Sequence, residues 1–269
     1  MNDKYKNHAN NIATTGSVKC TVVKASGETA EKETEIIREK FITVTVNGQK
    51  AFYLSCTPEN LTELVIGRLY TEKIIRSVNE VTELFICGKG DIAEVILAGE
   101  VKFKAFDGVE PTCCTGNKQF LVRERDDSES ISNINEDNIE SKVIPLSEHI
   151  FELAEYFKKD GELHKSTGGT HSCYIRFGNG RILSFEDISR HNALDKAVGA
   201  MLLQGEKPQE CMIYTTGRVA ADMVIKTVAA GVPVLVSKAV PTEEAVKLAE
   251  KYGLTLICRA WPDSYEIYS

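Results

Sequence analysis

Two kinds of hydrophobic pattern divide the chain into halves that predict different folds. In the first half, the β-rich runs 42–46 and 51–56 flank Asn47-Gly48, and such a dipeptide between β-rich runs predicts a hairpin. Thr57-Pro58-Glu59 then sets a capping residue, a proline and an acid before apolar positions at helical spacing, so a helix is expected to begin there. Short apolar runs at 81–86, 92–97 and 101–106 predict more strands. The first half is therefore expected to be α+β.

The second half alternates predicted helices and strands. A helix is expected after Ser147 and a second hairpin around Gly178-Asn179-Gly180, and helical spacing continues from Leu194 to Met201. Three strands follow at 211–215, 232–236 and 254–258, and helices separate them. Because these strands are apolar without alternation, we expect a parallel sheet covered on both faces. This half is expected to be α/β.

The segment that joins the halves has a different composition. Residues 121–142 are acidic, rich in Ser and Asn, and without hydrophobic periodicity, which predicts a mobile connection. We therefore expect four regions: a poorly ordered or irregular N-terminus (1–35), an α+β subdomain (36–120), the flexible connection (121–142) and an α/β domain (143–269).

Composition narrows the class of protein. The 269 residues are 42% hydrophobic and 26% charged, enough to bury a sizeable core. A net charge of -7 argues against nucleic acid as a partner. Residues 1–17 contain no apolar signal-peptide core, and no run approaches membrane-spanning length, so we expect a cytoplasmic protein with reduced thiols and no membrane partner.

The eight cysteines do not share one setting. Cys113 and Cys114 follow Pro111 and precede Gly116, an exposed context in which a thiolate can meet a partner. A zinc site would require separated ligand pairs, and the chain offers only this pair and His171-Ser172-Cys173, so no metal is expected. The cysteines in or at the ends of predicted strands are expected to be buried and inert; they are Cys56, Cys87, Cys173, Cys211 and Cys258.

The predicted parallel sheet also indicates where a ligand would bind. Ligands of open α/β sheets lie beyond the carboxyl ends of the strands, where helix N-termini receive anions. Three loops with hydroxyl or cationic side chains occur at these ends: Thr216-Gly217-Arg218, Ser237-Lys238 and Cys258–Pro262. One such loop would be ordinary surface polarity, but three on one rim favour an anionic, phosphorylated ligand.

Two further segments are dense in polar groups. They are Ser166–His171 and Glu186–Lys196. In the second segment, Arg190, His191 and Asn192 lie at a predicted helix start, where their donors can meet a phosphate, and Asp195 and Lys196 are expected in the first turn.

Five stretches of the chain carry a specific similarity: "STGGTHSCYI", "EDISRHNALDKAVGAMLLQG", "TTGRVAADMVIKTVAAGVPVL", the ending "EIYS" and "VNGQKAFYLSCTPENLTELVIGRLYTEKIIRS". Together they resemble one known family, the formate dehydrogenase accessory sulfurtransferases (FdhD), and the resemblance extends from about residue 40 to the end. The resemblance implies an α/β, cytidine-deaminase-like three-layer domain without the deaminase zinc site, an additional N-terminal α+β subdomain, and a homodimer. It also implies that persulfide sulfur is accepted from a cysteine desulfurase and passed to the molybdenum cofactor, a bis-molybdopterin guanine dinucleotide, for formate dehydrogenase.

The same resemblance assigns site residues. Many members have Cys-x-x-Cys where this chain has Cys113-Cys114, and we assign the persulfide to Cys114 with Cys113 second. Trp261 stands where a basic residue is common. GDP or GMP is expected to mimic the cofactor, whose expected contacts are Ile257, Cys258, Arg259, Ala260, Trp261, Pro262, Thr167, Gly168, Gly169, His171, Arg190, His191, Asn192, Asp195, Lys196, Gly217 and Arg218.

Two alternatives remain open at this point. A chaperone that binds the cofactor without sulfur chemistry fits the altered cysteine motif, and a relic of a zinc-dependent deaminase fits the implied fold. Labelling with a sulfur donor separates the first alternative from a sulfurtransferase, and metal analysis tests the second.

Overall fold

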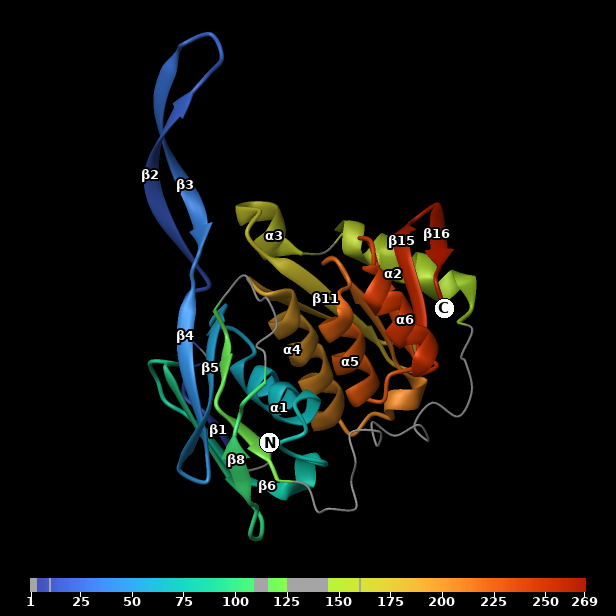
Figure 1. Ribbon diagram of the computed structural model, residues 1–269. Helices are drawn as coiled ribbons and strands as arrows, with labels where there is room; N and C mark the ends of the chain where they lie inside the picture. The colour runs from blue at the N-terminus through green and yellow to red at the C-terminus, as the bar shows by residue number, and fades with distance from the viewer. Residues whose placement is uncertain (1–3, 10, 109–115, 125–144, 160) are drawn as a thin grey trace.

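Two six-stranded sheets and two two-stranded ribbons make up the strands of the computed structural model (Figure 1), counted over the residues that it describes, 4–9, 11–108, 116–124, 145–159 and 161–269. Each half of the chain contributes one of the large sheets. None of the helices in the described ranges is long and apolar enough to span a membrane.

The first sheet has the order β1-β6-β7-β4-β5-β9. The predicted hairpin is confirmed as β4 (Lys40–Val46) and β5 (Gln49–Cys56) around Asn47-Gly48, and both turn residues have positive φ. Helix α1 (Leu61–Thr71) packs on one face, where residues such as Ile42, Leu64 and Val95 form the core. The other strands are β1 (Tyr5–Asn7), β6 (Val81–Ile86), β7 (Ile92–Leu97) and β9 (Lys118–Gln119), and a 3₁₀ turn covers Val78–Glu80.

Helix α1 begins later than the sequence predicted. The expected start at Thr57-Pro58 is wrong, because the helix begins at Leu61 after Asn60 in the left-handed conformation. The Thr57 hydroxyl does not cap the helix and instead donates to the Asp187 carboxylate at 3.1 Å. The Thr57 hydroxyl is thus used in a contact with a residue 130 positions away and not in capping the helix that follows it.

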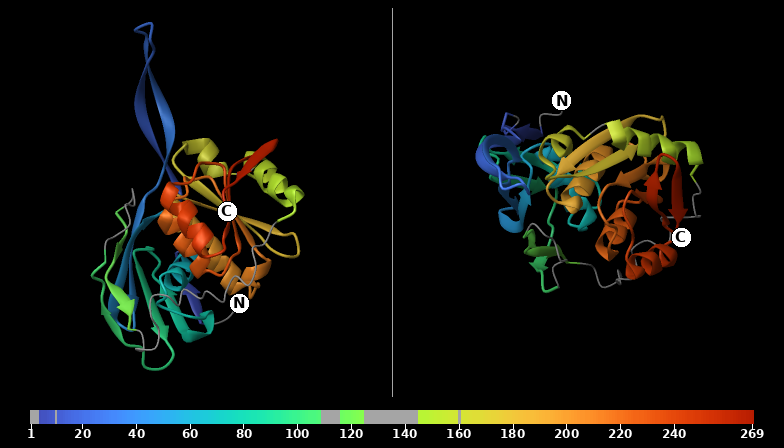
Figure 2. Two further views of the ribbon diagram at one scale, coloured as in Figure 1. Left: turned by 45° about the vertical axis from the view of Figure 1, so that its right-hand side comes forward. Right: turned by 90° about the horizontal axis from the view of Figure 1, so that it is seen from above.

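The N-terminal residues form a regular ribbon where an irregular segment was expected. Strands β2 (Thr15–Val23) and β3 (Thr29–Ile37) pair antiparallel over nine residues each, and they extend away from the body in both side views (Figures 1 and 2). The expectation for residues 1–35 is wrong here, because Val18, Cys20 and Val22 of β2 alternate with polar residues at the period-2 spacing of a strand, and β3 pairs with β2 along its whole length. We call this ribbon, residues 15–37, the arm.

A small ribbon follows the first sheet. Strand β8 (Phe103–Ala105) pairs with β10 (Leu121–Arg123), so the start of the expected flexible connection is a strand. Residues 125–142 of that connection lie outside the described residues.

The second sheet has the order β12-β11-β13-β14-β15-β16. The three apolar strands β13 (Met212–Thr215), β14 (Val234–Ser237) and β15 (Thr255–Trp261) are parallel, as predicted. On one side of them lies the antiparallel hairpin of β11 (His171–Arg176) and β12 (Ile182–Asp187), and on the other β16 (Ser264–Ile267), which the sequence did not predict.

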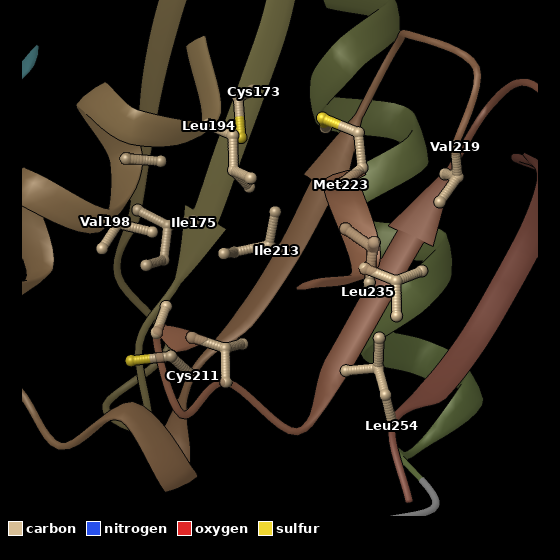
Figure 3. Packing of buried hydrophobic residues seen from close by; sticks show 14 of the residues in the cluster. Cys173, Ile175, Leu194, Val198, Cys211, Ile213, Val219, Met223, Leu235 and Leu254 are labelled. Atoms are coloured by element: carbon tan, nitrogen blue, oxygen red, sulfur yellow. The ribbon is translucent and has the colours of Figure 1, made fainter. Parts of the chain in front are cut away.

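Helices cover both faces of this sheet and give three layers (Figures 1 and 2). One core lies between the sheet and α4 (Arg190–Leu203), α5 (Ala221–Ala229) and α6 (Glu243–Lys251), with Ile213, Val198 and Met223 at its centre (Figure 3). A second core packs α2 (Ser147–Lys159) against the opposite face. Short turns complete the domain, namely α3 (Glu162–Thr167), which was not predicted, and a 3₁₀ turn at Pro208–Glu210.

Helix α1 of the first half crosses helix α4 of the second half at close range. A Cβ added to Gly67 would lie 1.8 Å from the Asp195 carbonyl oxygen, and one added to Gly199 would lie 1.9 Å from that of Glu63. Only glycine allows backbones to approach this closely. The two halves therefore form one packed unit around α1 and α4.

Candidate functional site

The carboxyl ends of β13, β14 and β15 lie side by side and form the rim that the sequence predicted. Thr216 connects this rim to β11, because its amide donates to the Ser172 carbonyl (3.0 Å) and its hydroxyl accepts from the Ser172 amide (3.0 Å). The Ser237 hydroxyl donates to the Gly217 carbonyl at 2.8 Å. The first residues of β11 and of α4 therefore stand at the same edge as the three strand ends, and we use the word rim for this edge.

Arg190 opens helix α4 on this rim. Gly217 packs against its side chain so closely that a Cβ at Gly217 would lie 3.0 Å from the Arg190 Cβ. The Arg190 Nε is buried and has no hydrogen-bond partner among the described residues. Since a buried N–H donor without a partner is costly, this guanidinium at a helix N-terminus is suited to an anion.

His191 follows Arg190 and is held by helix α5. Its Nε2 lies 2.6 Å from a carboxylate oxygen of Asp222, in the first turn of α5. Burial opposes ionisation of Asp222, but the hydrogen bond and charge of His191 outweigh it and lower the pKa of Asp222. This carboxylate fixes the orientation of the imidazole.

His171 stands at the start of β11, where it pairs with Asp187 of β12. Burial, reinforced by the positive charge of Arg190, lowers the pKa of His171, so its imidazole is neutral near neutral pH. It follows the turn that ends α3, where Gly168 has a φ of 66° and the Thr167 hydroxyl accepts from the Gly169 amide. The predicted segment 166–171 is therefore a structured corner of the rim.

Only some of the side chains in the C-terminal segment 257–262 face solvent at the rim. Ile257, Cys258 and Ala260 point into the two cores, so their expected contact with a ligand is limited to the backbone. Arg259 and Trp261 are exposed. The Lys238 ammonium lies 5.4 Å from the Trp261 ring centroid and 4.6 Å from that of Phe157, close enough for cation–π contact.

The remaining predicted contacts on this edge differ in exposure. Arg218 is exposed, Pro262 is partly buried, and Gly217 is buried under Arg190. The rim thus brings together a guanidinium, a neutral imidazole, a lysine and an indole.

Asp195 and Lys196 are not on the rim, which corrects the expectation that they contact a ligand. Both side chains have 0% exposure. Lys196 pairs with Asp187 at 2.8 Å and donates to the Thr57 hydroxyl at 2.7 Å. Asp195 accepts from Thr71 and from Lys226, at 2.8 and 2.9 Å. These groups stabilise the contact between the two halves, since buried charges are retained only where partners satisfy them.

Asn192 belongs to the same buried contact. Its amide donates to the Ser55 carbonyl at 2.7 Å and to Asp187 at 3.0 Å, and its Oδ1 accepts from Asn117 at 2.8 Å. We call this set the junction network; its members are Asp187, Asn192, Asp195, Lys196, Thr57, Asn117, Arg68, Thr71, Glu72 and Lys226.

Asn117 is a residue that sequence reasoning missed. It is 7% exposed, and its Oδ1 accepts from the Ser55 amide at 2.8 Å while its amide reaches α4. The only available signal was its place directly after Cys113-Cys114-Thr115-Gly116. The cysteine pair itself lies outside the described residues.

The described cysteines fall into two groups. Cys56, Cys173, Cys211 and Cys258 are buried, and burial raises the pKa of each thiol, to about 12 for Cys211 and Cys258. Cys20 is exposed on the arm, and the Cys87 thiol donates to Asp91 at 2.8 Å. The expectation of buried thiols is confirmed for those four, whereas Cys87 is only partly buried.

Two further observations complete the survey of the described residues. No group of three or more His, Cys, Asp or Glu side chains within them is arranged to hold a metal ion. A depression of about 370 Å³ lies between the end of α6 and the last three residues, next to the start of β15 and so at the opposite end of the sheet from the rim.

The chain is thus a three-layer α/β protein with cationic side chains at the carboxyl rim of its sheet, the edge at which open α/β sheets bind ligands. Comparison with known proteins is more specific. The FdhD/NarQ family model matches residues 37–269, and the chain belongs to this family.

Individual relatives agree with that assignment. The sulfur carrier protein FdhD of Bacillus pumilus is 30% identical over 246 residues, which cover 90% of this chain and 91% of the relative. That of Bacillus licheniformis is 31% identical over 247 residues and covers 91% of each chain. The crystal structure of a putative formate dehydrogenase accessory protein from Desulfotalea psychrophila has the same fold, with a TM-score of 0.74, 22% identity and coverage of 96% and 97%.

Proposed function

We propose that the chain is a sulfur carrier that accepts persulfide sulfur from a cysteine desulfurase and transfers it to the molybdenum cofactor, as bis-molybdopterin guanine dinucleotide, for formate dehydrogenase. The names of the relatives support sulfur transfer as the activity. The description of the Desulfotalea psychrophila protein supports an accessory role toward formate dehydrogenase. A cytoplasmic location remains a prediction.

The distribution of thiols supports Cys114 and Cys113 as the carriers. Sulfur transfer requires a thiolate, and burial raises the pKa of four of the described thiols, so these stay protonated near neutral pH. Cys87 is engaged with Asp91, and Cys20 lies on the arm outside the part that the family model matches. The adjacent pair is the remaining choice.

The observation that carries the proposal is the anchoring of Asn117 to Asn192. The hydrogen bond of 2.8 Å ties the chain just after the cysteines to the first turn of α4, two residues from Arg190. Cys114 precedes Asn117 by three residues, so their Cα atoms are at most about 11 Å apart. Chain length alone therefore limits how far a sulfur on Cys114 can travel from this anchored position.

The side chains of the rim are complementary to the chemical groups of the proposed substrate. The buried Arg190 Nε, which has no partner in the part of the chain that the structure describes, and the N-terminus of α4 favour a phosphate. Trp261 offers an aromatic face for a guanine ring, and the neutral His171 has donor and acceptor capacity for a polar edge. These residues would hold the phosphates and the guanine while the cofactor brings its own metal chemistry.

The sulfur steps use only thiols and the substrate. The Cys114 thiolate attacks the terminal sulfur of the donor persulfide, a new S–S bond forms, and the donor cysteine leaves with the electron pair of the broken S–S bond. Cys114 then carries the sulfane sulfur as a persulfide. In the second step the S–S bond of the persulfide would break, Cys114 would keep its electron pair and return as a thiolate, and the substrate would accept the neutral sulfur atom by supplying the electron pair of the new bond, so that the substrate is the two-electron reductant.

Mass spectrometry of the protein after incubation with a cysteine desulfurase and cysteine tests this function. We expect an adduct with the mass of one sulfur atom that dithiothreitol removes, and peptide mapping should place it on residues 113–114. An unmodified pair in a protein that still binds GDP would favour the chaperone alternative instead.

A further inference from the structure

The Asp187 carboxylate joins three parts of the molecule. The residue ends strand β12 and has 0% exposure. Its Oδ1 accepts from the Ser189 amide at 2.9 Å and from the Asn192 side-chain amide at 3.0 Å, both at the start of α4. Its Oδ2 accepts from the Thr57 amide and hydroxyl of the first half, each at 3.1 Å, and pairs with the Lys196 ammonium at 2.8 Å. The end of β12, the first half and the start of α4 are therefore held by one side chain.

The start of α4 depends on this carboxylate because the N-cap residue of the helix does not cap it. Ser189 is that N-cap residue, and its side chain makes no capping hydrogen bond to the first turn. Asp187, two residues earlier, instead accepts from the Ser189 amide, and such a bond between a side chain and the backbone fixes a tight turn. The direction in which α4 leaves β12 is therefore set by Asp187 and not by the Ser189 hydroxyl.

Arg190 follows this turn directly and has little room to move. Its side chain packs on Gly217 so closely that a Cβ added there would lie 3.0 Å from the Arg190 Cβ, and its Nε is buried without a partner among the described residues. The first-turn N–H groups of a helix have no acceptor within the helix, so side-chain and backbone donors meet at this one place. A change in the direction of α4 would move all of these donors together.

We propose that Asp187 is a positioning residue for the rim, which acts through the start of α4 and aims the Arg190 guanidinium and the first-turn amides at an anionic ligand. The inference rests on the proposed function, which places a phosphate at these donors. Asp187 does not contact the ligand itself, since it is fully buried, and Lys196 compensates its charge, so that it does not repel a nearby anion. Hydrogen bonds weaken steeply when donors lose their alignment, so the ligand should bind less tightly once this turn is released.

Asp195 provides a matched control in the same network. Like Asp187, it has 0% exposure and binds one lysine and one threonine hydroxyl, here Lys226 at 2.9 Å and Thr71 at 2.8 Å. It lies inside α4, and none of its side-chain hydrogen bonds within the described residues reaches the start of the helix. The loss of either carboxylate should therefore destabilise the fold, but only the loss of Asp187 should change the rim.

Calorimetric titration of the full chain with GDP compares the two aspartates. It is carried out at a temperature at which circular dichroism shows the wild type and the variants to be folded. Asp187→Asn should bind GDP about tenfold more weakly than the wild type, the effect of one misaligned hydrogen bond to a charged group. Asp195→Asn should bind GDP as the wild type does. Unchanged affinity in Asp187→Asn, or equal losses in both variants, would overturn the proposal.

A double variant separates positioning from stability, and it also serves if Asp187→Asn alone does not fold. Asp187→Asn/Lys196→Met has no uncompensated charge at this place, so it should be more stable than a variant that loses one partner only. It still lacks the carboxylate that holds Ser189 and Asn192, so its affinity for GDP should stay about tenfold below that of the wild type. Recovery of wild-type affinity in the double variant would show that Asp187 acts through stability alone and would contradict the proposal.

The outcomes also distinguish this inference from the proposed function. If the wild type does not bind GDP, the rim is not the ligand site, and the inference fails together with the proposed contacts of the substrate. If the wild type binds GDP and Asp187→Asn binds it equally well, the inference alone fails. Loading of sulfur by a cysteine desulfurase, followed by the mass of the chain, tests the carrier function separately.

Discussion

The rim and the junction network draw on the same short segment of sequence and use its charges in opposite ways. On the rim, Arg190 keeps a buried Nε without a partner among the described residues. In the junction network, the charged ends of Asp195 and Lys196 are fully occupied by neighbours from both halves. The difference separates a surface able to receive a ligand from a contact that holds the molecule together, although both contain cations and carboxylates.

Helical geometry explains how one segment serves both regions. Asn192, Asp195, Lys196 and Gly199 are spaced i, i+3, i+4 and i+7, which places them on one face of α4, and that face meets α1 and Thr57. Arg190 and His191 lie at the helix start and face the rim and α5. This face of α4 is buried against the first half, and such a face is usually apolar; here it is polar because it contacts polar groups of the first half.

Breaking the junction network should have the largest effect on stability. Lys196→Met leaves the Asp187 carboxylate buried without its ion-pair partner, which is expected to cost about 3–5 kcal/mol. The free energy of unfolding in urea measures this loss. Lys247→Met, which removes an exposed partner of Glu243 on α6, is the control and should cost less than about 1 kcal/mol. Equal losses for the two variants would contradict a structural role for the buried pair.

Acid should weaken the same network through Glu72. Burial opposes its ionisation, but Lys226 and Arg68 outweigh it and lower the pKa of Glu72 from 4.5 to about 2. A lowered folded-state pKa stabilises the protein above the unfolded value, so this contribution is complete above about pH 5.5 and is lost as the pH falls from there toward 2. The shift corresponds to about 3 kcal/mol.

Urea unfolding between pH 7 and pH 3 measures this contribution. Glu72→Gln should be less stable than the wild type at pH 7 and should lose less stability on acidification. Parallel pH profiles for the two proteins would rule out Glu72 as a source of the acid sensitivity.

Changing the rim should affect binding more than folding. Arg190→Met removes the proposed phosphate partner and should weaken GDP binding by about tenfold to a hundredfold in calorimetry, the range of a charge-assisted hydrogen bond. The melting temperature without ligand should change little. Arg181→Met, at the far end of the β11–β12 hairpin, is the matched control and should bind GDP as the wild type does. An Arg190→Met variant that binds GDP with the affinity of the wild type would contradict the assignment of the rim as the binding site.

The sequence predicted local elements well where a short pattern determines them. Asn47-Gly48 between β-rich runs required a hairpin, and the unbroken apolar runs of β13, β14 and β15 required a sheet covered on both faces. The sequence predictions were wrong where the role of a residue depends on a partner far away in the sequence. Thr57 looks like a helix cap until its hydroxyl bonds to Asp187. Asp195 looks like a ligand contact until Arg68 and Thr71 of α1 bind it, and Lys196 looks like one until Asp187 and Thr57 bind it.

The sequence predicted where the candidate site lies better than it predicted which residues form it. The rim follows from strand order, which the alternation of helices and strands implies. Ile257 and Cys258 were included because the family resemblance assigns the whole loop 257–262 to the cofactor, yet both side chains point into the cores. Asn117 was missed because its role depends on Asn192, 75 positions away.

The most direct test of the central claim is the transfer of labelled sulfur by cysteine variants of the full chain. With a cysteine desulfurase and radiolabelled cysteine, Cys114→Ser should lose protein-bound sulfane label, because a hydroxyl is far less nucleophilic than a thiolate near neutral pH. Cys113→Ser should lose less, and Cys211→Ser, a change of a buried thiol, should keep the label in its folded fraction. A Cys113→Ser/Cys114→Ser double variant that carries label and activates formate dehydrogenase as the wild type does would contradict the account.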